Sequence, residues 1–302
     1  MLAAVAVGAC PAYAGTLRVA EDGREFIAVY DGELPVLRYV RGEILAETIA
    51  EDRRRSTYVH PLYSLDGRPL TDDFPEGHPH HRGVSWMWQR VTFDGVTKDL
   101  WTLKGVRQKY DSHDHWIDES SRTVLAVSGG WFEDSTGRRI LNEIVTITVH
   151  PLRPEGRIID WEIRLAAIDT IVEIGVSERG YSGFNVRFGP REETTIVTSK
   201  GPVTEDCDRV RYAWADLSGK FGGSDRFDGV TVFDCRSNPR FPSGWTLRFY
   251  GVLNPAFTST STDHRIEPGK PLVLRYRVLV HEGKADPDVL HRMFREYDNM
   301  CR

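Results

Sequence analysis

Apolar and polar residues alternate along much of the chain, and this two-residue period is typical of strands with one buried face. In "RIIDWEIRL" (157–165), charged residues stand between the apolar ones, and the same alternation recurs in "EIVTITVH" (143–150) and "LVLRYRVLVHEG" (272–283). The residues expected to face the core in these strands are Val145, Ile147, Val149, Ile159, Trp161, Ile163, Leu165, Leu272, Leu274, Tyr276, Val278 and Val280.

Further β-rich runs are separated by Gly, Asp, Asn and Pro, as expected for strands joined by turns. A clear helix is predicted only near the C-terminus, in "ADPDVLHRMFREYDNM" (285–300). There Asp286 is suited to cap the helix and Pro287 to occupy its first turn. The absence of a βαβ rhythm predicts an all-β fold. We expect one large antiparallel β-sandwich domain over residues 15–302, with a short C-terminal helix.

Charge and hydropathy narrow the classes of partner. The 302-residue chain has a formal net charge of −5, whereas a nucleic-acid surface needs clustered Lys and Arg. The basic run "EDRRRS" (51–56) is too short to form one. Beyond the N-terminus, no apolar run reaches the roughly 18 residues of a membrane span. We therefore expect a small-molecule partner, without nucleic acid and without a span of the membrane.

The N-terminal segment has the pattern of an export signal. Residues 1–14 are apolar and end in "AYA", with small residues at the positions typical of a signal-peptide end. Cleavage after Ala14 predicts a periplasmic or secreted protein, and lipidation at Cys10 is the alternative. Among the remaining cysteines, a bridge between Cys207 and Cys235 is one interpretation and free thiols are the other.

The stretch "TDDFPEGHPHHRGVSWMWQRV" (71–91) concentrates most of the candidate chemistry, with His78, His80, His81 and Arg82 inside five positions. If it enters a strand, His78 and His80 point to one side and His81 to the other. The histidines could transfer protons beside a carboxylate, while Arg82 holds an oxyanion. They could also bind a divalent metal together with an aspartate, or serve only the loop backbone.

Other candidates lie outside this stretch. Glu143 stands in a predicted strand, where a carboxylate needs a partner or a task, so it is a candidate base. Aromatic, amide and guanidinium groups that suit a sugar site are supplied by Tyr181, Arg187, Trp214 and Asn238. A second His-x-His pair in "DSHDHW" is expected to lie in a solvated loop.

The chain resembles a bacterial family labelled "methane oxygenase PmoA-like", from about residue 17 to 297, on the motifs "HPLYSLDGRPLTDDFPEGHPHHRGVSWMW", "GYSGFNVRF", "FDCRSNPRFPSGW" and "EPGKPLVLRYRVLVHEG". The resemblance implies a galactose-mutarotase-like supersandwich in an exported sugar-catabolic system. It does not imply oxygenase chemistry, because the methane monooxygenase subunit of that name is an integral membrane protein. The positions that match the family's motifs are His60, Asp73, His78, His80, His81, Arg82, Gly83, Trp131, Glu143, Tyr181 and Asn238.

These features predict an exported protein that acts on a sugar or sugar derivative as an epimerase, lyase or hydrolase. A cluster histidine would be the acid and Asp73 or Glu143 the base. The residues expected to bind the substrate are His60, Arg82, Trp131, Tyr181, Trp214 and Asn238. The alternatives are a carbohydrate-binding protein without catalysis and a metal-dependent enzyme. The metal-dependent version requires His60, two cluster histidines and an aspartate to converge.

Overall fold

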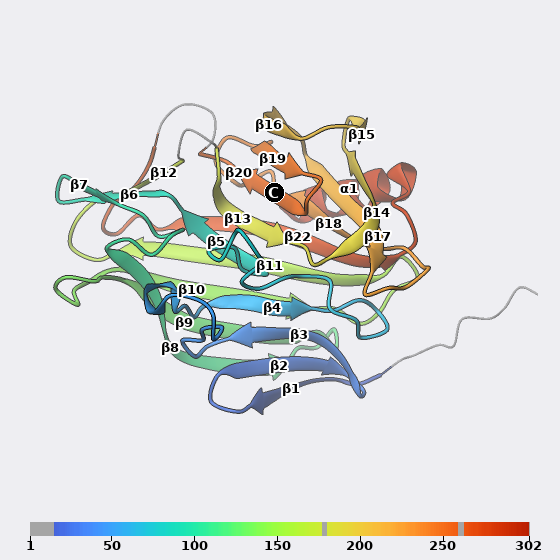
Figure 1. Ribbon diagram of the computed structural model, residues 1–302, viewed down its shortest axis with the longest axis horizontal. Coiled ribbons are helices and arrows are strands. Elements are labelled where there is room, and N and C mark those ends of the chain that lie inside the picture. Colours follow the sequence, from blue (N-terminus) through green and yellow to red (C-terminus); the bar gives the residue numbers. More distant parts are fainter. Residues whose placement is uncertain (1–14, 177–179, 259–262, 302) are drawn as a thin grey trace, which may run out of the picture.

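The computed structural model describes residues 15–176, 180–258 and 263–301, and these residues form three antiparallel sheets and one helix (Figure 1). The all-β prediction, a large antiparallel sandwich with a short C-terminal helix, is confirmed. The predicted signal peptide (1–14), with Cys10 and Ala14, lies outside the described residues.

The first sheet has nine strands and carries most of the candidate chemistry on its outer face. Its strands, in spatial order, are β1 (Leu17–Asp22), β2 (Phe26–Asp31), β3 (Leu34–Val40), β4 (Tyr58–Leu62), β5 (Val84–Trp88), β13 (Ser182–Arg187), β20 (Val252–Ala256), β19 (Gly244–Arg248) and β16 (Cys207–Arg211). A 3-10 turn, Glu51–Arg53, precedes β4.

The second sheet also has nine strands, and a third sheet of four short strands completes the fold. The order of the second sheet is β15 (Gly201–Val203), β14 (Arg191–Thr198), β17 (Trp214–Phe221), β18 (Asp228–Asp234), β22 (Leu272–Glu282), β11 (Arg157–Ala167), β10 (Arg139–Val149), β9 (Thr123–Glu133) and β8 (Val106–Ile117). The order of the small sheet is β21 (His264–Ile266), β12 (Val172–Gly175), β6 (Arg90–Phe93) and β7 (Val96–Lys98).

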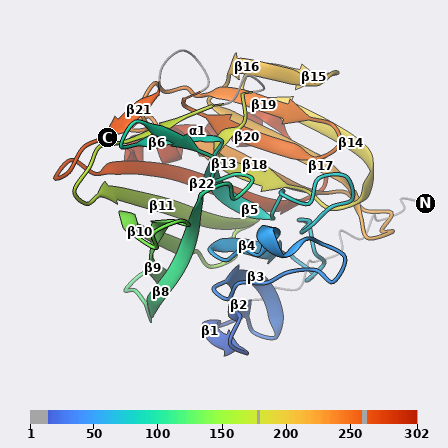
Figure 2. The ribbon, with the colours of Figure 1, turned by 60° about the vertical axis from the view of Figure 1, so that its left-hand side comes forward.

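The two large sheets lie one over the other (Figure 2). Aromatic side chains fill the space between them. Trp86 of β5 packs against Trp161 of β11 with ring centroids 6.0 Å apart, and Phe184 of β13 stacks on Tyr276 of β22 at 4.6 Å. All twelve residues predicted to face the core are buried there. The alternation along β10, β11 and β22 therefore identified the inner face of the second sheet correctly.

The helix α1 (Pro287–Met300) packs on the outer face of the second sheet, where Leu290, Met293 and Tyr297 are buried. The Asp286 carboxylate accepts hydrogen bonds from the amides of Asp288 and Val289, so the predicted cap is confirmed. It is the one helix of α type in the described part of the chain, and no helix there is long and apolar enough to cross a bilayer.

The cysteines and one histidine segment differ from the interpretations drawn from the sequence. The structure pairs Cys235 with Cys301 and leaves Cys207 free, so neither the Cys207–Cys235 bridge nor free thiols throughout is correct. The pairing forms because α1 brings its last turn to the end of β18, with the two Cα atoms 5.9 Å apart. The "DSHDHW" segment is strand, not loop, because residues 112–117 continue the pairing of β8 with β9. His113 and His115 thus lie on an edge strand.

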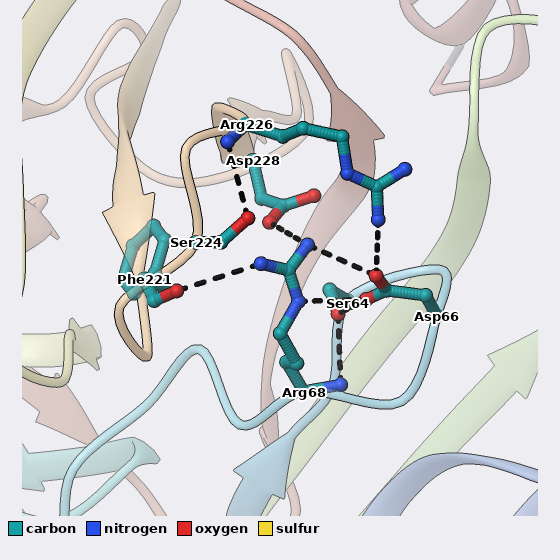
Figure 3. Close-up of polar contacts among 7 residues, drawn as sticks. All are labelled: Ser64, Asp66, Arg68, Phe221, Ser224, Arg226 and Asp228. Atoms are coloured by element: carbon teal, nitrogen blue, oxygen red, sulfur yellow. Dashed lines mark hydrogen bonds and ion pairs between the residues drawn. The ribbon is translucent and has the colours of Figure 1, made fainter.

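A cluster of charged groups ties the loop after β4 to the second sheet (Figure 3). Arg68 donates to the Asp66 carboxylate at 3.0 Å and to the Asp228 carboxylate of β18 at 2.8 Å. Arg226, from the turn between β17 and β18, also reaches Asp66. The segment that leads toward the histidines is therefore anchored on both sheets.

The disulfide can be tested by substitution. It closes a loop of 66 residues, and a loop of that length stabilises a fold by about 4 kcal/mol through the entropy of the unfolded chain. We expect Cys301→Ser to lower the free energy of unfolding by about 2–4 kcal/mol in urea titration. Cys207→Ser, which removes the unpaired thiol, is the matched control and should change it little. Equal losses in both variants would contradict the pairing.

Candidate functional site

The three clustered histidines lie in a turn, not in a strand. The amide of His78 donates to the Pro75 carbonyl and the amide of His81 donates to the His78 carbonyl, before β5 begins at Val84. The expected separation of His78 and His80 from His81 is therefore wrong, because a turn does not alternate its side chains. The turn gathers all three rings in one place.

The rings of this turn pack against aromatic side chains from three other segments. His81 lies 5.3 Å from His78, 4.8 Å from His80 and 5.7 Å from Trp101 by ring centroids. Tyr181 joins the same group, 6.1 Å from His81 and 5.7 Å from Trp101. His81 is only 3% exposed, whereas His78, His80 and Tyr181 are half-buried.

Two tyrosines and two arginines extend this group across the sheet. The Tyr181 hydroxyl lies 3.0 Å from the Tyr250 hydroxyl, and Arg248 of β19 donates to Tyr181 from Nε at 3.0 Å. The Tyr250 ring stacks on His78 at 5.3 Å and lies beneath the guanidinium of Arg187 at 4.8 Å. We refer to His78, His80, His81, Trp101, Tyr181 and Tyr250 as the aromatic cluster.

Strand β13 aims polar side chains at the same face. Because successive residues of a strand point to opposite sides, Phe184 enters the core while Asn185 and Arg187 face outward. Asn185 is fully buried, and neither atom of its amide has a hydrogen-bond partner among the described residues. The same lack of a hydrogen-bond partner among the described residues is found for three other buried atoms, Nε and Nη1 of Arg187 and Nδ1 of His81. Each such group costs about 1–3 kcal/mol, so this face is built for something other than stability.

Burial and nearby arginines keep His60, His80 and His81 uncharged. Burial is the main cause that lowers the pKa of His81 to about 2 and the pKa of His80 to about 4, with further lowering by neighbouring histidines and arginines. His60 of β4 is lowered to about 4, mainly by burial, and its Nδ1 lies 3.1 Å from the Thr71 hydroxyl. At neutral pH these rings are neutral and carry no imidazolium proton that they could donate.

Arg82 and Asp73 hold the turn together. The guanidinium of Arg82 donates to the carbonyls of Pro79, His81 and Arg53, and it stacks on the Phe74 ring at 3.5 Å. Asp73 lies 3.4 Å from Arg82 and accepts from the Tyr58 hydroxyl at 2.8 Å, and burial raises its pKa to about 6. Both side chains are 8% exposed or less. They therefore hold the backbone of the histidine turn in place, beneath the surface, rather than contact a ligand.

Gly83 lets this turn lie against β4. A Cβ atom at this position would be 2.1 Å from the Val59 carbonyl oxygen and 2.9 Å from the Cβ of His60. Any side chain here would push β5 away from β4, so the glycine of "HHRG" is a packing requirement.

The structure places four of the predicted site residues elsewhere. Glu143 accepts from Trp131 at 2.8 Å and from Gln108 at 3.0 Å inside the core, on the opposite side of β5 from the aromatic cluster. Burial raises its pKa, and nothing brings it to a histidine. Trp214 packs beneath α1, and the Asn238 amide is bonded to Asp234 and to the backbone of Arg275. The predicted base Glu143 and the predicted ligands Trp131, Trp214 and Asn238 therefore do not join the cluster.

The structure brings together His78, His80, His81 and Tyr181, whereas His60 is bonded to Thr71. It also adds residues that the sequence did not single out. Trp101 lies in the turn that follows β7, and Tyr250 lies between β19 and β20. Only the aromatic identity of these two residues hinted at a role. Their place opposite the histidines depends on the fold.

The residues do not fit a metal site. Within the described ranges, no three His, Cys, Asp or Glu side chains converge so that they could hold a metal ion. The convergence that the metal-dependent interpretation required is thus not found around His60 and the clustered histidines. What the site offers is proton acceptors, phenol hydroxyls, guanidinium groups and flat rings.

Comparison with known proteins adds a family. Residues 27–295 match the model of a family described as "Family of unknown function (DUF6807)". The chain belongs to this family. No curated protein matches its sequence. The resemblance to the PmoA-like family stays a prediction.

Solved structures align with the chain at low similarity. A human-microbiome protein described as a kojibiose phosphorylase is 11% identical with a TM-score of 0.40, over 91% of this chain and 32% of that one. A 4-alpha-glucanotransferase from Thermococcus litoralis is 12% identical with a TM-score of 0.28, over 88% and 39%. The chain thus spans well under half the length of either protein.

The buried histidines predict a specific pH dependence of stability. The unfolded chain takes up a proton at a histidine near pH 6.5, whereas folded His81 does not until about pH 2, so stability falls as the pH drops below 6.5. Between pH 7.5 and 5.0 we expect His81 to contribute a loss of about 2 kcal/mol. Urea unfolding should show that His81→Gln loses less stability than wild type over this interval. Equal losses would contradict an uncharged His81.

Proposed function

We propose that the protein binds a sugar or sugar derivative on the outer face of the first sheet and transfers protons to and from it there. The observation that carries this proposal is the aromatic cluster beside the unpartnered polar atoms of His81, Asn185 and Arg187. Rings stack on the apolar C–H faces of sugars, and fixed donors and acceptors bind hydroxyl groups. The reaction would be an epimerisation, elimination or hydrolysis.

The charge states of the groups suggest how protons would move. His80 and His81 are uncharged, so neither can be the acid expected from the sequence. His80 is the better candidate base of the two, because burial lowers the pKa of His81 further. Tyr181 is the candidate acid. Its phenolate would be stabilised by the N–H of Arg248 and by the hydroxyl of Tyr250, whose pKa is raised mainly by burial and which therefore keeps its proton.

The second candidate function is carbohydrate binding without catalysis. It is favoured by one observation: within the part of the chain that the structure describes, no carboxylate is hydrogen-bonded to a histidine of the cluster. A histidine–carboxylate pair is the usual device for proton transfer by an imidazole. The two functions use the same residues and differ in whether the sugar is changed.

We also propose that the protein is exported. The segment "AYA" at residues 12–14 supports a signal peptide, and the Cys235–Cys301 disulfide is of the kind that persists in oxidising compartments.

The enzymatic proposal is tested by incubating the protein in D2O with a panel of neutral and acidic mono- and oligosaccharides and following them by NMR. We expect a new product or deuterium at a sugar carbon. His80→Gln and Tyr181→Phe should each slow this change by about 100-fold or more. His115→Gln, on the distant edge strand β8, is the matched control and should not slow it.

Saturation-transfer NMR on the same samples separates the two functions. Contact with a sugar that is never changed would replace the enzymatic proposal by carbohydrate binding. No contact with any sugar of the panel would refute both.

A further inference from the structure

A small cavity opens beside the aromatic cluster and is dominated by arginine. Its volume is about 190 Å³, and its wall includes Tyr250, which also stacks on His78. The charged side chains that line it are Arg187, Arg191 and Asp72. Tyr250 is therefore common to the cavity and to the cluster.

Arg187 has unused hydrogen-bonding capacity at this cavity. Its side chain is 8% exposed, and its Nε and Nη1 atoms have no hydrogen-bond partner among the described residues. Its backbone is bonded on both sides, since its N–H donates to the Gly83 carbonyl at 2.8 Å and its carbonyl accepts from the Asp72 amide at 3.0 Å. Its guanidinium lies over the Tyr250 ring, 4.8 Å from the centroid. A guanidinium with free donors favours an oxyanion as its ligand.

Arg191 differs from Arg187 in that its guanidinium is largely occupied. It donates to the Gly189 carbonyl at 2.9 Å and to the Phe249 carbonyl at 2.6 Å, while burial lowers its pKa to about 10. Arg191 therefore adds positive charge to the cavity wall, but most of its N–H donors are already used. Arg187 is left as the group that would contact a ligand directly.

The balance of charge selects the kind of anion. Two guanidinium groups and one carboxylate leave the wall with one net positive charge. A monoanion would neutralise this charge, whereas the dianion of a phosphate would exceed it and would approach Asp72. A planar carboxylate also matches the planar donor edge of a guanidinium.

We propose that Arg187 binds the carboxylate of a uronic acid, with the sugar ring lying over the aromatic cluster. The inference rests on the proposed function of that cluster, and it names the substrate class. The carboxylate would occupy the cavity beside Tyr250, and the carbon that bears it would lie toward His80 and Tyr181, the candidate base and acid. A base and an acid near that carbon are what epimerisation or elimination of a uronate requires.

Calorimetry and saturation-transfer NMR can test this with D-galacturonate, its trimer and D-glucuronate as probes, beside D-galactose and D-glucose. We expect the uronates to bind more tightly than the neutral sugars. Arg187→Gln should weaken uronate binding about 10- to 100-fold and change binding of neutral sugars little. Arg164→Gln, an exposed arginine on β11, is the matched control and should have no effect.

The outcomes separate this inference from the proposed function. Equal binding of galactose and galacturonate, unaffected by Arg187→Gln, would overturn the carboxylate subsite and leave sugar binding intact. Tighter binding of D-glucose 6-phosphate than of glucuronate would overturn the choice of carboxylate in favour of phosphate. No binding of any probe would overturn both. If Arg187→Gln does not fold, the wild-type series and Arg187→Lys, which keeps the charge but not the planar edge, decide the question.

Discussion

The packing of β13 into the middle of the first sheet is the constraint on which the candidate site depends. Phe184 is fixed in the core by Tyr276, and the period of the strand then forces Asn185 and Arg187 outward. A shift of one residue in its pairing with β5 would place an arginine in the core and a phenylalanine among the histidines. The hydrophobic core thus sets the position of the polar groups on the other face.

The site is maintained against a cost in stability. An arginine without full hydrogen bonding and a buried amide without partners lower the free energy of unfolding, and below about pH 6.5 so do histidines that stay uncharged. The surrounding structure offsets this cost with extensive aromatic packing, the disulfide at α1 and the charged groups that join Asp66, Arg68 and Asp228. Such an imbalance between one face and the rest of a domain is typical of functional sites.

Alternation and capping patterns were sufficient to predict the strands β10, β11 and β22 and the helix α1, because burial in a sandwich repeats every second residue. The same pattern could not show which sheet faces which, so Glu143 and Trp131 were grouped with the histidines although they lie within the core. For residues 78–82 the expectation that side chains alternate, as in a strand, was wrong, because these residues form a turn and a turn gathers neighbouring side chains. Trp101 and Tyr250 reach the site through loops, and loop positions depend on long-range packing that short motifs do not record.

The arginine-lined cavity has a consequence for the rate at which a ligand arrives. The chain carries a net charge of −5, so its surface as a whole repels anions, while Arg187 and Arg191 make one small region attractive to them. An anionic ligand would be guided to that region and slowed elsewhere. The Debye length is only about 10 Å at 0.1 M salt, so added salt would weaken this guidance and reduce the association rate more than the dissociation rate.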